Sequence, residues 1–177
     1  MNEFYQIFFN RKRARVAGVS IAMFLFIAPF LGNAQPPPPR PIAIYVNPAQ
    51  GLIFGAFFQG TSGGSVIVYP DGSRSTTGDI LQANLGIPFS PAIFEVDANP
   101  GTVVSILNGP DVTLTGSNGG SMRLHIGASS PTSPFITTAR PPDRTQVRIG
   151  GTLTVGNALA NPSGTYSGSF SVTFIQE

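Results

Sequence analysis

The sequence has 177 residues and a formal net charge of +2, from ten Lys and Arg against eight Asp and Glu. Four of the basic residues lie within the first 15 positions, so the chain after residue 34 keeps six Arg, seven acidic residues and a formal charge of −1. A nearly neutral chain without Lys has no basic surface to neutralise phosphates, which excludes nucleic-acid binding. The absence of Cys excludes disulfides, thiolate metal sites and cysteine-linked lipids.

Residues 1–34 have the layout of a secretory signal peptide. A basic cluster at residues 11–15 precedes an apolar run of 16 residues, 16–31, and small residues follow at the positions that signal peptidase reads. A membrane-spanning helix needs about 20 apolar residues. We therefore expect cleavage after Ala34 and no permanent membrane span, with an uncleaved anchor as the alternative. Export without Cys indicates a secreted or cell-surface protein of the bacterial envelope.

The remaining sequence divides into a spacer and one domain. Residues 35–41, Gln-Pro-Pro-Pro-Pro-Arg-Pro, predict an extended spacer, because Pro fixes φ and has no N–H group. Residues 42–177 contain short apolar runs between Gly, Pro, Asn and Asp turn signals, as in all-β domains. We predict a single antiparallel, immunoglobulin-like β-sandwich. Its expected strands are residues 42–46, 52–58, 65–69, 92–97, 102–107, 112–115, 122–126, 147–155 and 165–174.

Three local patterns predict details of this domain. Residues 70–72, Pro-Asp-Gly, predict a tight turn, because Pro presets φ and Gly accepts a positive φ. Residues 99–101, Asn-Pro-Gly, predict a hairpin between the strands on either side of them. Strict alternation over Thr165–Phe174 predicts one long strand. Its core-facing side chains would be Tyr166, Phe170, Val172 and Phe174.

Several short motifs between residues 50 and 175 form a set. They are Leu52–Gly55, Gly63–Val66 leading to Pro70–Arg74, Val112–Thr115, Gly150–Gly156, and Asn161–Gly168 continuing to Thr173. The set resembles a family of exported bacterial domains of unknown function, serial number four-four-zero-two. The ending, Gly-Thr-Tyr-Ser-Gly, is its most specific part and also resembles that of spore-coat-U-type and secreted chaperone–usher pilins. Neither resemblance implies catalytic residues.

Catalytic patterns are weak throughout the sequence. The Gly-rich segment 60–64 contains Ser62, as a serine-protease nucleophile loop would, but the single His, His125, lies downstream rather than upstream. We interpret the segment as a loop between strands and His125 as a surface residue.

Glu95 and Asp97 project from one face of a predicted strand whose inward residues are Phe94 and Val96. They are interpreted as a solvated face, with a hydrolase as the remote alternative. We therefore predict no enzyme activity, no metal and no cofactor.

The leading functional hypothesis is a structural or adhesive cell-surface module. Residues 42–46, with Ile42, Ile44 and Val46 on one face, have the pattern of a strand that can complete a neighbour's sheet, as donor strands do. The same segment can instead fold back and close an edge of its own domain. The expected partner is a second copy or another envelope protein.

The alternative hypothesis is an extracellular carbohydrate- or ligand-binding module. Such a module would present exposed aromatic side chains, and large exposed apolar patches mark interaction sites. The candidates are Tyr45, Phe57, Phe58 and Tyr69.

Overall fold

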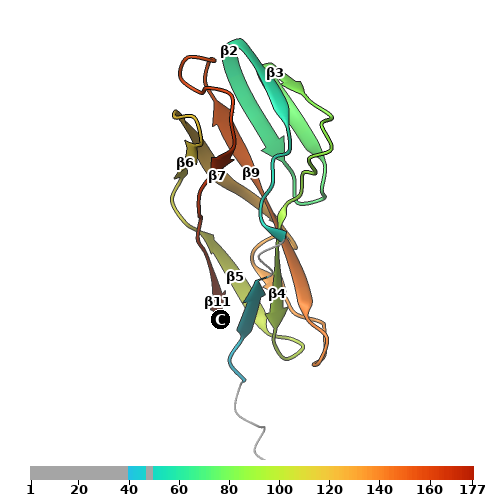
Figure 1. Ribbon diagram of the computed structural model, residues 1–177. Coiled ribbons are helices and arrows are strands. Elements are labelled where there is room, and N and C mark those ends of the chain that lie inside the picture. The colour runs from blue at the N-terminus through green and yellow to red at the C-terminus, as the bar shows by residue number, and fades with distance from the viewer. Residues whose placement is uncertain (1–39, 47–49) are drawn as a thin grey trace, which may run out of the picture. The chain divides into compact units, whose positions relative to one another are not determined.

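The computed structural model describes residues 40–46 and 50–177 (Figure 1). Every regular element in this part of the chain is a β-strand, which confirms the predicted all-β class. The predicted signal peptide, residues 1–34, and spacer residues 35–39 lie outside the described residues.

The described residues form eleven strands. They are β1 (Ala43–Val46), β2 (Phe57–Val68), β3 (Arg74–Gln82), β4 (Ala92–Asp97), β5 (Val103–Asn108), β6 (Val112–Gly116), β7 (Ser121–Ser130), β8 (Phe135–Ile136), β9 (Thr145–Val155), β10 (Tyr166–Ser167) and β11 (Val172–Gln176).

The strands form two sheets, and every strand pair is antiparallel, as predicted. The larger, eight-stranded sheet has the order β1-β4-β9-β7-β6-β10, with β2 also paired to β9 and β3 paired to β2. The smaller sheet has the order β11-β5-β8. The free edges therefore belong to β1, β3, β10, β8 and β11.

Strand β9 connects most of the larger sheet. Along one side, residues 145–149 pair with β4 and residues 151–155 pair with β2. Along its other side it pairs with β7, whose register shifts between Ile126 and Ser129. Gly150 lies where β2 ends and β4 begins, and a Cβ at this position would clash with the carbonyl oxygen of Val68. The two strands can approach the same side of β9 because this residue has no side chain.

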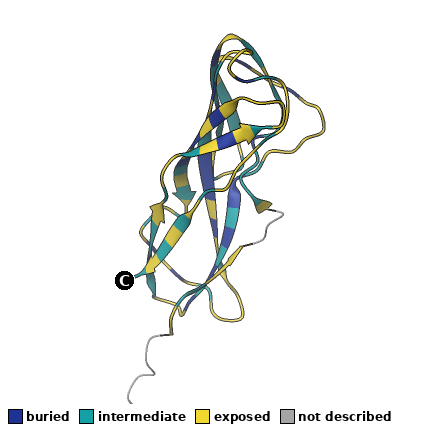
Figure 2. Ribbon diagram, turned by 60° about the vertical axis from the view of Figure 1, so that its left-hand side comes forward, coloured by how far each residue is buried: buried dark blue, intermediate teal, exposed yellow. Residues whose placement is uncertain are grey.

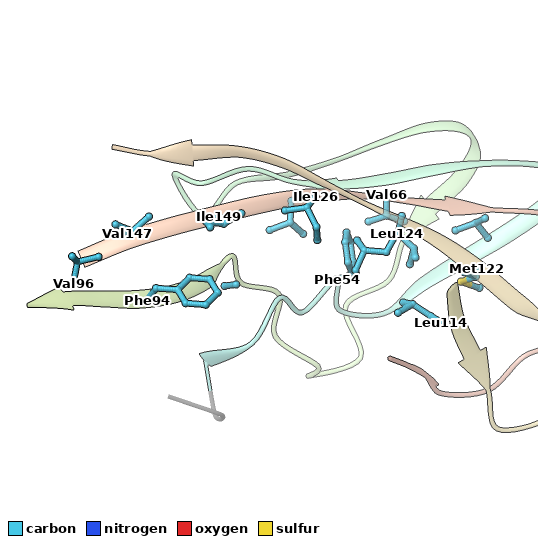
Figure 3. Close-up of a cluster of buried hydrophobic side chains, with 14 of the residues drawn as sticks. Phe54, Val66, Phe94, Val96, Leu114, Met122, Leu124, Ile126, Val147 and Ile149 are labelled. Carbon is cyan, nitrogen blue, oxygen red and sulfur yellow. The ribbon is translucent and has the colours of Figure 1, made fainter. Parts of the chain in front are cut away.

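Both sheets contribute to one hydrophobic core. Figure 3 shows side chains that the larger sheet contributes to it, with Phe54 beside them. Val66, Val147 and Ile149 of the larger sheet and Val104 of β5 have no exposed surface. The rings of Phe94 and Phe174 are 5.4 Å apart between centroids, which joins β4 to β11 across the two sheets. Buried and exposed residues alternate along several strands, as Figure 2 shows. One face of the larger sheet therefore packs on the core while the other meets solvent.

The hairpin predicted at residues 99–101 is wrong. Strand β4, before the turn, pairs with β1 and β9, whereas β5, after it, pairs with β11 and β8. The turn carries the chain from one sheet to the other, and the Gly101 N–H donates to the carbonyl of Thr137 at 2.8 Å. A turn signal indicates a change of direction but does not specify which strand becomes the partner.

The single carboxyl-terminal strand predicted for residues 165–174 is also wrong. The chain pairs first with β6, through β10, and then with β5 of the smaller sheet, through β11. The alternation of inward and outward side chains continues across this change of sheet, because the even-numbered residues face the core in both short strands. The residues that are half-buried and packed against the core are Tyr166, Phe170, Val172 and Phe174.

Strand β2 also differs from its prediction. The Gly-rich segment 60–64 is not a loop between strands but the irregular centre of β2, whose pairing with β3 shifts between Gln59 and Gly64. The tight turn at residues 70–72 is confirmed, since the Gly72 N–H donates to the carbonyl of Tyr69 at 3.0 Å. It leads into β3, a polar edge strand that the apolar pattern did not indicate.

The close approach at β9 gives a stability prediction. Gly150→Ala should lower the free energy of unfolding by about 1–3 kcal/mol, because the clashing atom belongs to the backbone and cannot turn aside. Gly127→Ala is the matched control on the neighbouring strand, where the nearest atom would lie at an ordinary 3.5 Å. Thermal and urea unfolding of both variants measure the difference. Equal stability of the two would contradict the packing argument.

Candidate functional site

Strand β1 forms one edge of the larger sheet, beside β4 of the same chain. Ile44 pairs with Val96, and Val46 pairs with Phe94. Cross-strand partners share a face, so Ile44 and Val46 point to the side of the sheet on which these two buried residues lie. They are nevertheless 36% and 59% exposed, whereas Ile42 packs against the core. The apolar face of β1 is thus only partly covered within the described chain.

One arginine fastens β1 from the neighbouring loop. The Arg144 guanidinium donates to Glu95 Oε2 at 2.8 Å and lies 3.6 Å from the ring centroid of Tyr45. The hydrogen bond with Glu95 raises the pKa of Arg144, so its charge is fully retained. Arg144 therefore contacts Tyr45 on β1 and Glu95 on β4 with the same planar group, as guanidinium chemistry permits.

A second ion pair and one hydrogen bond lie at the start of β1. Arg40 Nη2 is 3.6 Å from Asp97 Oδ2 at the end of β4. The Ile42 N–H donates to Gln176 Oε1 at 3.1 Å, which links β1 to β11 of the smaller sheet. Edge strands of the two sheets therefore meet at this point. Glu95 and Asp97, interpreted from the sequence as a solvated pair, each have an arginine partner.

The structure does not bring the four candidate aromatic residues together as one surface. Tyr45 lies on β1 under Arg144, and Phe57 packs against the core. Phe58 is exposed at the start of β2, opposite Leu81. Tyr69 follows the other end of β2, about 35 Å from Phe58 by strand length, and its hydroxyl lies 3.1 Å from Ser75 Oγ.

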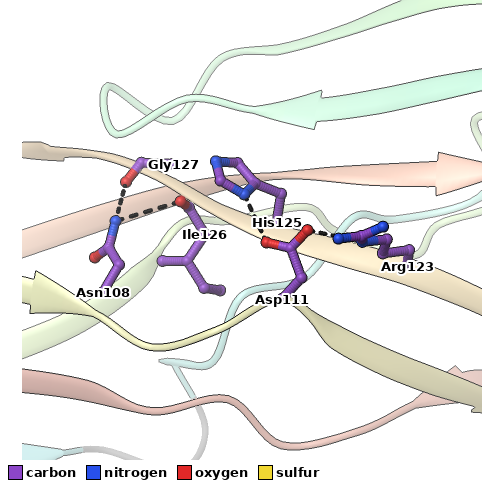
Figure 4. A network of polar contacts seen from close by, with 6 residues as sticks. All are labelled: Asn108, Asp111, Arg123, His125, Ile126 and Gly127. Atoms are coloured by element: carbon purple, nitrogen blue, oxygen red, sulfur yellow. Dashed lines mark hydrogen bonds and ion pairs between the residues drawn. The ribbon is translucent and has the colours of Figure 1, made fainter.

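A second polar cluster lies on the exposed face of β7 (Figure 4). Asp111 accepts from Arg123 Nε at 2.7 Å and lies 2.7 Å from His125 Nδ1. The hydrogen bond with His125, assisted by Arg123, lowers the pKa of the Asp111 carboxyl. Sequence reasoning missed Asp111, because nothing in its surroundings indicates that it reaches residues 12 and 14 positions away.

Two further observations concern the described part of the chain. It contains no group of three or more His, Cys, Asp or Glu side chains that could hold a metal ion. None of its elements is a helix long and apolar enough to cross a membrane.

The fold and the β1 edge define a class: a small all-β domain of two antiparallel sheets with one core. The model of the family named Domain of unknown function (DUF4402) matches residues 44–175, more than half of the chain, so the chain belongs to this family. The match begins in β1 and ends in β11, and both edge strands are therefore part of the family's domain. Neither the curated proteins nor the solved structures contain a significant match.

The arginine contacts predict how firmly β1 is held. Arg144→Gln removes the ion pair with Glu95 and the stacking on Tyr45, both of which are weak contacts at a solvent-exposed position. We expect amide hydrogen exchange at residues 43–46 to become severalfold faster while the core strands stay protected. Arg148→Gln is the control, since Arg148 is also exposed but bonds only to Gln146. Equal exchange in both variants would contradict the fastening role.

The Asp111 cluster predicts a pH dependence. The pKa of the Asp111 carboxyl is lower in the folded chain than in the unfolded chain, where Asp titrates at about 3.9. Its contribution to stability is therefore full above about pH 4 and is lost as the pH falls through the folded value. Asp111→Asn should lose less stability than the wild type between about pH 5 and pH 2. Thermal unfolding across this range measures the difference. Asp143→Asn is the control, since the exposed Asp143 carboxylate makes no hydrogen bond or ion pair within the described residues.

Proposed function

We propose that the chain is an exported, non-enzymatic structural or adhesive module of the bacterial cell surface, with an immunoglobulin-like sandwich that assembles by exchanging β1 between copies. The observation that carries the proposal is how weakly β1 is covered and how it is held at the sheet edge. This strand has only four residues, its apolar face is partly uncovered, and side-chain contacts fasten it at the sheet edge. A strand held in this way is suited to replacement by the same strand of another copy.

The contacts that hold β1 are divided between the strand and the body of the domain. Tyr45 and Arg40 belong to the amino-terminal segment, while Arg144, Glu95 and Asp97 belong to the body. Each contact therefore forms equally well when segment and body come from different chains. A tethered strand has a high effective concentration for its own edge, so exchange requires neighbouring copies to be concentrated, as they are on a cell surface.

Other features support the same proposal. Residues 1–34 have the pattern of a signal peptide, and the proline-rich residues 35–39 are suited to spacing a strand away from a surface. The two sheets share one core, as the sheets of a sandwich do. The motif that resembles the pilin ending, residues 164–168, includes β10, just before the chain passes to the smaller sheet.

The test is the solution mass of the processed protein, measured by light scattering after gel filtration. Head-to-tail exchange of β1 is an open association, so the wild type should give a ladder of masses that lengthens with concentration. Ile44→Asp places a carboxylate on the core-facing side of β1 and should collapse the ladder to one species of small, fixed mass.

Leu159→Asp is the matched control, because Leu159 is 91% exposed in the loop between β9 and β10. It should keep the ladder. A single small mass for the wild type at every concentration would refute exchange, and so would an unchanged ladder in Ile44→Asp.

A further inference from the structure

The edges of the two sheets are unequally protected against pairing with another chain. Natural edge strands avoid such pairing by being short, irregular, charged or interrupted by Pro. Strand β3 carries Arg74 and Asp79 and is irregularly paired, and β8 and β10 have two residues each. Strand β1 has four residues, preceded by Pro41. Only β11 among the described edges has none of these features.

Strand β11 is a regular strand with an uncharged sequence, Val-Thr-Phe-Ile-Gln. All five of its residues pair with β5 without a register shift. Its inward side chains Val172 and Phe174 are only half-buried, although they pack against the core. On the outer face, Ile175 is 44% exposed and Leu107 of β5 is 61% exposed. The strand thus presents apolar side chains on both faces beside an open edge.

The hydrogen bonds to β5 identify which backbone groups of β11 face the open edge. The Ser171 carbonyl accepts from Gly109, and the Glu177 N–H donates to Val103. In an antiparallel pair, successive residues direct their backbone groups alternately toward and away from the partner. Residues 173 and 175 therefore bond to β5, and the N–H and C=O groups of Val172, Phe174 and Gln176 point outward. No strand of the described chain pairs with them, although the Gln176 side chain accepts from the Ile42 N–H.

A row of unpaired backbone N–H and C=O groups is best satisfied by the backbone of another β-strand. Residues 36–39 of the spacer cannot fill this role, because four successive Pro residues have no N–H to donate. Strand β1 is already paired with β4. A second copy of β11 fits, since an uncharged strand meets no like charge in its own copy.

We propose that β11 pairs with β11 of a second copy, antiparallel and about a two-fold axis that passes through Phe174. In this register Phe174 faces its own copy and Val172 faces Gln176 of the second chain. All three are residues whose backbone groups point outward, so each of these pairs exchanges two hydrogen bonds. On the outer face Thr173 lies opposite Ile175 of the second chain. The pairing doubles the three-stranded sheet into one continuous sheet across two molecules.

The absence of Cys makes a register-specific test possible. Directly opposed residues of an antiparallel pair are close enough for a disulfide, whereas residues two positions apart are not. We expect a mixture of Thr173→Cys chains and Ile175→Cys chains to form a dimer band on a non-reducing gel after mild oxidation. Each variant alone should form far less. Ile136→Cys is the matched control, since Ile136 is 63% exposed on the far edge of the same sheet.

A second experiment places charged residues on the outer face of β11. Thr173→Lys with Ile175→Lys sets like charges directly opposite each other in the dimer only, because their partners on β5 are uncharged. This double variant should be a monomer in the Ile44→Asp background, and so should the corresponding double Asp variant. An equimolar mixture of the two should recover the dimer mass at low salt, which shows that both variants remain folded.

Each outcome decides the matter. Cross-linking of the mixture no stronger than with Ile136→Cys overturns the pairing, as does a double Lys variant that keeps the dimer mass. Strong cross-linking of Thr173→Cys by itself overturns the two-fold register. The cross-linking assay reads β11 alone and should be unaffected by Ile44→Asp, so this proposal and the exchange of β1 can fail separately.

Discussion

The whole larger sheet depends on the packing of three strands around β9. Strands β2 and β4 arrive end to end on one side of it and β7 lies along the other, so most of the sheet is held through this one strand. The close approach at Gly150 makes this arrangement possible, and the register shift in β7 lies beside it. Val147 and Ile149, both fully buried, then fix which face of β9 meets the core. The positions of β1 and its arginine partners follow from that.

The sequence predicted the properties that depend on neighbouring residues. Alternation of apolar and polar residues indicated all-β structure, and Pro and Gly indicated the turn at residues 70–72. It failed where pairing depends on residues distant in the chain. The turn at residues 99–101 has the composition of a hairpin, but β4 and β5 belong to different sheets. Strand β3 has a single buried apolar residue, Ile80, and is otherwise stabilised by pairing with β2, so its own residues showed no strand pattern.

The same limit applies to the site. Ile42, Ile44 and Val46 were recognisable as an amphipathic strand because their spacing is local. The residues that fasten this strand were not, since Arg144 is 49 positions from Glu95 and still further from Tyr45. The sequence alone does not show which distant residue an isolated charged residue will contact. Their roles are set by the register of β1, β4 and β9, which is a property of the fold.

The two apolar edges differ in the kind of assembly that each permits. Charged side chains surround β1, and their contacts are divided between strand and body, so the proposed exchange would be directional, screened by salt and open-ended. Strand β11 carries no charge and meets its own copy in the proposed pairing, so that association closes as soon as two molecules have met. An open contact at one edge and a closed contact at the other would join linear assemblies side by side. If both proposed contacts form, the domain would connect neighbours in two dimensions through the pairing of its two sheet edges.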